Sequence, residues 1–79
     1  MLMETEPCKI EKELGTIRDM DNYKICLNLV SVGNKPPMID LRQYVAENGK
    51  YNPAKGFSFT NDEALTLVGL LDAYLDEKK

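Results

Sequence analysis

The pattern of apolar and polar residues is clearest in the middle of the chain, where it has the period of two that a strand requires. In residues 23–32, YKICLNLVSV, the positions 23, 25, 27 and 29 are apolar or aromatic and alternate with Lys24, Cys26 and Asn28. Residues 38–44, MIDLRQY, repeat the alternation, with Ile39 and Leu41 on one face. Residues 33–35 and the proline pair after them are typical of a turn before a strand start. The two segments therefore predict a hairpin.

Weaker signals flank this hairpin. Residues 9–18 space their apolar positions more like a helix, but their Gly-Thr-Ile sequence and the turn signal that follows favour a weak first strand. Residues 46–56, AENGKYNPAKG, concentrate Gly, Asn and Pro, which predicts a long exposed loop. The sequence after this loop, FSF, predicts a short strand at 57–59.

The C-terminal part of the chain, from Asn61 to about Asp76, is predicted to be helical. Thr60 and Glu63 form a capping-box pattern at its start. One apolar stripe follows at helical spacing and is expected to cover the sheet. The stripe consists of Ala64, Leu67, Val68, Leu71, Tyr74 and Leu75.

The helix carries more apolar surface than one sheet face requires. Leu65 and Leu70 lie outside the centre of the stripe, and Gly69 would allow another backbone to approach closely. A dimer contact explains this surplus, and a broad core stripe is the alternative. The predicted dimer contact consists of Leu65, Val68, Gly69, Leu70 and Tyr74.

The charge of the chain is unevenly distributed. The formal net charge is -3, but residues 18–60 carry six basic and four acidic residues and the two flanks are acidic. This basicity is far below that of a usual nucleic-acid-binding domain, so charge alone favours an ordinary solvated surface. The 79 residues are enough for one domain, which would be marginally stable as a monomer.

Few residues suit catalysis or metal binding. Histidine is absent, and neither a phosphate-binding loop nor a metal-ligand spacing occurs, so we expect no enzyme activity, no cofactor and no metal. Cys26 lies within a strand pattern and is interpreted as a reduced packing thiol of a cytoplasmic protein. No stretch approaches the roughly 20 apolar residues of a membrane span, which predicts a soluble protein.

A binding surface is predicted on the sheet face opposite the helix. Lys24, Asn28, Arg42 and Tyr44 share one parity on the two hairpin strands and should project together. Cations can form ion pairs with phosphates, a guanidinium or a phenol ring can stack on unpaired bases, and an amide can form hydrogen bonds to the edges of bases. This combination therefore suits a single nucleic-acid strand. Further basic and aromatic residues could extend the track; they are Lys35, Lys50, Tyr51 and Lys55.

The order of these motifs resembles that of a known family. LNLVSV at 27–32, KPPMIDLRQY at 35–44 and KGFSFTNDE at 55–63 occur in the succession seen in the C-terminal domain of transcriptional positive cofactor four, a eukaryotic coactivator, and in its small freestanding bacterial relatives. The resemblance covers residues 9–75. It implies an α+β fold, in which a four-stranded curved antiparallel sheet precedes one C-terminal helix that forms a homodimer.

The resemblance also implies residue roles and a function. Arg42, Lys35 and Lys55 match basic positions that meet the nucleic-acid backbone, whereas two positions that often hold stacking aromatic residues are Val32 and Val45 here. Tyr44 or Tyr51 would then have to stack on bases. The family binds single-stranded DNA without sequence dependence, with roles in transcription, replication or repair.

The prediction is therefore a DNA-binding homodimer with a disordered tail at 1–7, a domain at 8–76 and a C-terminal tail at 77–79. Association with a bacterial nucleoid or with transcription or replication machinery is compatible with it. A protein-interaction module and an RNA-binding domain using the same surface remain alternatives. The predicted nucleic-acid-binding residues are Lys24, Asn28, Val32, Asn34, Lys35, Met38, Arg42, Tyr44, Lys50 and Lys55.

Overall fold

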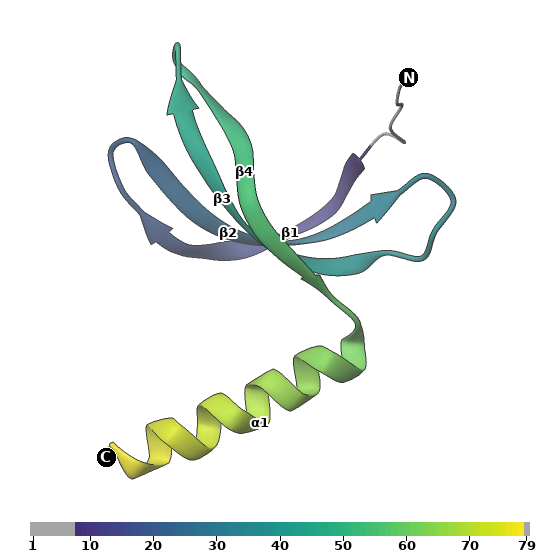
Figure 1. Ribbon diagram of the computed structural model, residues 1–79, viewed down its shortest axis with the longest axis vertical. Coiled ribbons are helices and arrows are strands. Elements are labelled where there is room, and N and C mark those ends of the chain that lie inside the picture. Colours follow the sequence, from purple (N-terminus) through teal and green to yellow (C-terminus); the bar gives the residue numbers. More distant parts are fainter. Residues whose placement is uncertain (1–7, 79) are drawn as a thin grey trace.

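The computed structural model describes residues 8–78 and has four strands followed by one helix (Figure 1). The elements are β1 (Cys8–Asp19), β2 (Tyr23–Val32), β3 (Met38–Glu47), β4 (Lys50–Phe59) and α1 (Asn61–Glu77). Strands adjacent in sequence pair antiparallel, so β1 and β4 form the edges of an open sheet. The predicted α+β fold with this order of elements is confirmed. The tail predicted at 1–7 lies outside the described residues.

The pairing of β1 is irregular, and its apolar residues Leu14 and Ile17 lie at register shifts, so its apolar positions do not follow the strand period of two. Ile10 pairs with Val30 and Asp19 pairs with Lys24, so an advance of nine residues along β1 matches an advance of only six along β2. Three register shifts absorb the difference, and such bulges bend a strand and increase its twist. Every third residue of β1 therefore pairs with an even-numbered residue of β2. These β1 residues are Ile10, Glu13, Thr16 and Asp19.

The hairpin between β3 and β4 corrects one prediction. Asn48 and Gly49 both have positive φ, 53° and 80°, which is typical of a two-residue turn whose twist matches the strands. Residues 46–56 therefore form the end of β3, this turn and most of β4, and the prediction of a long loop there is wrong. Pro53 is tolerated because β4 is an edge strand. The predicted turn at 33–35 is confirmed, with Lys35 N–H donating to the Val32 carbonyl.

The sheet curls around one of its faces, here called the concave face, which carries Cys26, Asn28, Val30 and Asp40. These four residues are buried although α1 does not cover them. Sequence alternation predicted the core on the opposite, convex face, where Ile39 and Leu41 are only partly buried. That prediction is wrong for the single chain, because the bulged β1 bends the sheet toward the concave side.

Helix α1 begins as predicted. Thr60 Oγ1 accepts from Glu63 N–H at 3.1 Å, and Glu63 Oε1 accepts from Thr60 N–H at 2.9 Å, which completes the capping box. The helix then runs away from the sheet (Figure 1), and none of its described residues is buried. The prediction that its apolar stripe covers the sheet is therefore wrong within one chain. Over residues 8–78, no helix is long and apolar enough to cross a membrane.

Candidate functional site on the concave face

The concave face brings together the four residues on which the binding prediction was centred. Lys24 pairs with Tyr44 across β2 and β3, and Arg42 and Asn28 occupy alternate positions of the same parity. Residues that face each other in an antiparallel pair project to the same side of the sheet. The predicted common face of Lys24, Asn28, Arg42 and Tyr44 is therefore present.

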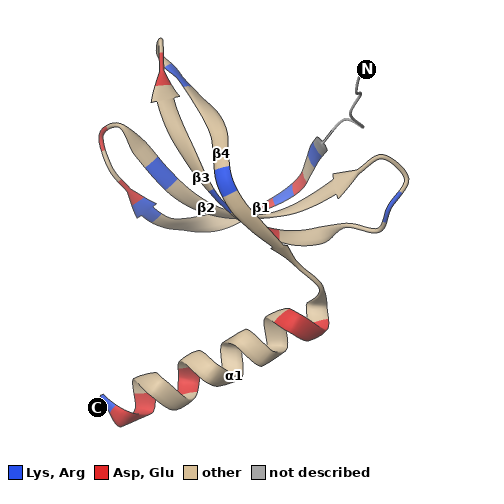
Figure 2. Ribbon diagram, viewed as in Figure 1, with Lys and Arg blue, Asp and Glu red and all other residues tan. Residues whose placement is uncertain are grey.

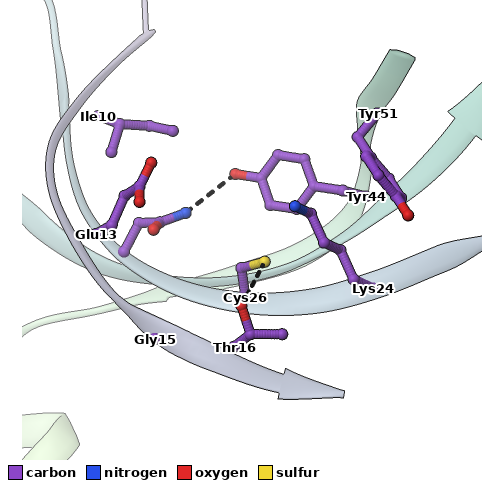
Figure 3. Close-up of a pocket in the computed structure, with 9 residues that line it drawn as sticks. Ile10, Glu13, Gly15, Thr16, Lys24, Cys26, Tyr44 and Tyr51 are labelled. Carbon is purple, nitrogen blue, oxygen red and sulfur yellow. Dashed lines mark hydrogen bonds between the residues drawn. The ribbon is translucent and has the colours of Figure 1, made fainter. Parts of the chain in front are cut away.

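An open pocket of about 210 Å³ lies on this face. Figure 3 shows Ile10 and Glu13 on one side of the pocket and Lys24, Tyr44 and Tyr51 on the other. Lys24 Nζ lies 4.5 Å from the centroid of the Tyr51 ring, within the range of a cation–π interaction. All four strands contribute residues to the pocket, since the curl of the sheet brings β1 and β4 toward each other.

A buried hydrogen bond orients the two central polar side chains of the pocket. Asn28, 4% exposed, donates from Nδ2 to Tyr44 Oη at 3.3 Å (Figure 3, dashed line). Burial raises the pKa of the Tyr44 phenol above its ordinary value, and the Asp40 carboxylate adds to this increase while the bond from Asn28 acts against it. The Tyr44 hydroxyl therefore keeps its proton at neutral pH and can donate a hydrogen bond.

Arg42 has a different environment from the one expected of a phosphate ligand. Its Nε and Nη2 both donate to the Asp40 carboxylate at 3.0 Å, and Nη1 donates to the Ala54 carbonyl at 2.7 Å. Ser58 Oγ donates to the same carboxylate at 3.0 Å. The Arg42 side chain is 28% exposed and that of Asp40 is 5% exposed. Arg42 therefore joins β3 to β4 and compensates a buried charge.

The remaining predicted residues are distributed over three regions. Val32 and Met38 continue the concave face toward the β2–β3 turn, and the turn itself contains Asn34 and Lys35. The β3–β4 register places Lys50 opposite Glu47 on the convex face. Lys55 also lies there, in a β4 bulge beside Phe57 and Leu41. The predicted basic track thus does not follow a single face.

Six residues that line the pocket were outside the predicted site: Ile10, Glu13, Gly15, Thr16, Cys26 and Tyr51. Tyr51 was named as an extension of the track and as a candidate for stacking on bases, but its segment was predicted to be a loop. The Asn-Gly dipeptide at 48–49 is a hairpin signal that would have placed Tyr51 on a strand. Thr16 Oγ1 lies 3.7 Å from Sγ of the buried Cys26, which agrees with a packing role for this thiol.

The helix and the sheet differ in charge. Figure 2 shows mostly acidic residues along α1 and both basic and acidic residues on the strands and the turns. The acidic residues of α1 are Asp62, Glu63, Asp72, Asp76 and Glu77. Within the part of the chain that the structure describes, no three side chains of His, Cys, Asp or Glu gather as a metal site.

Comparisons with known proteins add no assignment to this geometry. No protein-family model matches the chain, and no curated protein matches it.

Proposed function

We propose that this chain binds single-stranded DNA through the concave face, with little dependence on base sequence. The observation that supports the proposal is the uncovered pocket, around which Lys24, Asn28, Tyr44 and Tyr51 converge. Proteins that bind single strands combine cations for the phosphates with aromatic rings on which bases stack. Two tyrosine rings beside one ammonium group supply both parts, and the resemblance to positive cofactor four points the same way.

We infer that two copies associate through α1. Among the side chains described at residues 9–78, only Cys26 and Val30 are buried apolar residues, and a chain of this size needs a larger core to be stable alone. The helix stripe and the convex face are both apolar and exposed, as Val68 at 53% and Phe57 at 73% illustrate.

A second copy fits these two exposed surfaces. Each chain offers both a helix and a sheet face, so a two-fold dimer would bury both at once. The helix is acidic, and at the β4 side of the convex face Lys50 and Lys55 outnumber Glu47, so the charges at the edge of such a contact are complementary.

A paired lysine variant tests the DNA proposal. Lys24→Gln with Lys35→Gln removes one cation from the pocket and one from the β2–β3 turn. We expect about tenfold weaker binding of an oligothymidine at low salt, a loss of about 1.4 kcal/mol. The slope of log affinity against log salt should fall by about 1.4 in magnitude, because each contact to a single strand contributes about 0.7.

The variant Lys9→Gln with Lys12→Gln is the matched control, since Lys9 pairs with Ser31 and Lys12 with Leu29 on the convex face. It makes a charge change of the same kind away from the pocket and should have a much smaller effect. Equal effects of all lysine changes would show that binding follows net charge and not this face.

Protein docking is the second candidate function. The exposed apolar stripe of the acidic helix favours it, because exposed patches of this kind mark interaction sites. If the wild-type chain binds no single strand at low salt, this alternative replaces the DNA proposal.

A further inference from the structure

We propose that the pocket on the concave face receives one unstacked base and that Glu13 makes it prefer cytosine to thymine. The inference rests on the proposed binding of single-stranded DNA and adds a base preference at one position. The chain would still bind any sequence through phosphate contacts and stacking, and the cytosine preference would act in addition at the one base that enters the pocket.

The position of Glu13 follows from the bulges of β1. A regular strand would place residues 10 and 13 on opposite faces, whereas the register shift between Ile10 and Lys12 places both on the concave face. Glu13 pairs with Asn28, and both line the pocket. Figure 3 shows Glu13 across the pocket from Lys24 and Tyr44.

The size of the pocket limits what it can hold. About 210 Å³ is below the roughly 300 Å³ at which sites for drug-sized ligands begin. A single planar ring is a suitable occupant, and the Tyr51 ring offers a face on which it could stack. Lys24 lies over the Tyr51 ring, and on binding it would move from that ring to a phosphate.

Hydrogen-bonding groups around the pocket distinguish the two pyrimidines. The Glu13 carboxylate only accepts hydrogen bonds, and cytosine carries an amino group at C4 that donates them. Thymine has a carbonyl oxygen at the same position, which would face the carboxylate acceptor to acceptor. The Tyr44 hydroxyl can donate to the ring nitrogen or carbonyl oxygen of cytosine.

Fluorescence anisotropy tests this inference at neutral pH and fixed salt. The probes are labelled DNA strands of 15 nucleotides, one of oligocytidine and one of oligothymidine. The two bases have the same ring size and differ in their hydrogen-bonding groups and in the C5 methyl group of thymine, and the Glu13 variant isolates the hydrogen-bonding contribution. We expect the wild-type chain to bind oligocytidine about fivefold more tightly. Glu13→Gln should remove this preference, because its amide can also donate to the thymine carbonyl.

Glu11→Gln is the matched control. It removes the same charge two residues away, at a residue that accepts a hydrogen bond from Ser31 and does not line the pocket. Both variants should retain the fold, since both glutamates are exposed. We expect the control to keep the wild-type ratio of cytosine to thymine affinity, even if both affinities rise.

Two results would overturn the inference in distinguishable ways. Equal binding of both strands by the wild type, or a ratio that Glu13→Gln and Glu11→Gln change equally, removes the base preference and leaves the DNA proposal intact. Failure of the wild type to bind either strand removes both proposals together.

Discussion

At the residue scale, Arg42 is a cation of the concave face whose hydrogen-bond donors are used within the protein. Its guanidinium forms a bidentate pair with Asp40 and a further bond to the Ala54 carbonyl. A buried carboxylate left without this partner carries a desolvation cost that Ser58 alone would only partly offset. Substitution of Arg42 therefore changes stability as well as any contact with nucleic acid.

Arg42→Ala is expected to reduce the free energy of unfolding by about 2 to 3 kcal/mol. This loss is at or below the lower end of the range usual when one partner of a buried ion pair is removed, because the Arg42 guanidinium is partly exposed. Urea unfolding at neutral pH measures it. Arg18→Ala is the control, since Arg18 is exposed and its side chain donates to the exposed Tyr23 hydroxyl, and it should change stability by about 0.5 kcal/mol or less. Similar stabilities of the two variants would contradict the structural role of Arg42.

Regular alternation made part of the site predictable from the sequence. The common face of Lys24, Asn28 and Tyr44 follows from parity, because β2 and β3 pair without a register shift. Glu13 could not be assigned in this way, since the bulges of β1 change which residues share a face. The hydrogen bond from Arg42 to the Ala54 carbonyl could not be predicted from the sequence either, because it depends on the bulge in β4.

At the scale of elements, the β3–β4 hairpin depends on a close approach of Gly56 in β4 to Leu41 and Arg42 in β3. Gly56 pairs with Arg42, and a Cβ at residue 56 would lie 2.6 Å from the Leu41 carbonyl oxygen and 2.8 Å from Arg42 Cζ. A backbone oxygen cannot move aside as easily as the end of a side chain. The absence of a side chain at Gly56 therefore allows the Arg42 guanidinium to cross β4.

Gly56→Ala should destabilise the fold by about 1 to 3 kcal/mol, as is usual for an overpacked site. Thermal unfolding followed by circular dichroism measures the change. Gly15→Ala on the other edge strand is the control, because no atom outside its immediate chain neighbours lies within 4 Å of the added Cβ. A Gly56→Ala variant as stable as this control would show that the close approach is absent in solution.

Local signals predicted the elements unequally. The capping box at Thr60 and the alternation of β2 were sufficient, because each depends on neighbouring residues only. The β4 strand was predicted to begin at Phe57 and begins at Lys50, since the Gly, Asn and Pro content of this segment was interpreted as a loop. The curl that buries the concave face arises from pairing between strands, which single-segment patterns do not contain.

The whole molecule leaves two apolar surfaces uncovered, the convex face and the stripe of α1. Their exposure within one chain is the physical reason for the proposed dimer, since burial of apolar area is the main stabilising contribution to folding and association. The concave face lies on the other side of the sheet from the proposed contact. A dimer of this kind would leave both pockets accessible.

Sedimentation equilibrium at tens of micromolar protein should give twice the 9.0 kDa mass of one chain. Val68→Lys with Leu71→Lys places charges on the stripe, so we expect the mass of one chain and a lower free energy of unfolding. Thr66→Lys adds a charge outside the stripe and should keep the dimer. A stable, folded wild-type monomer at these concentrations would contradict the dimer.

The most direct test of the central claim is a titration of the wild-type chain with a labelled 20-nucleotide single strand of mixed sequence. Unlabelled single-stranded DNA, RNA and duplex of the same sequence serve as competitors at several salt concentrations. The concave face predicts tight binding that weakens steeply as salt rises, with single-stranded DNA competing far better than duplex. Absence of binding at low salt, or binding that salt does not change, would contradict the claim.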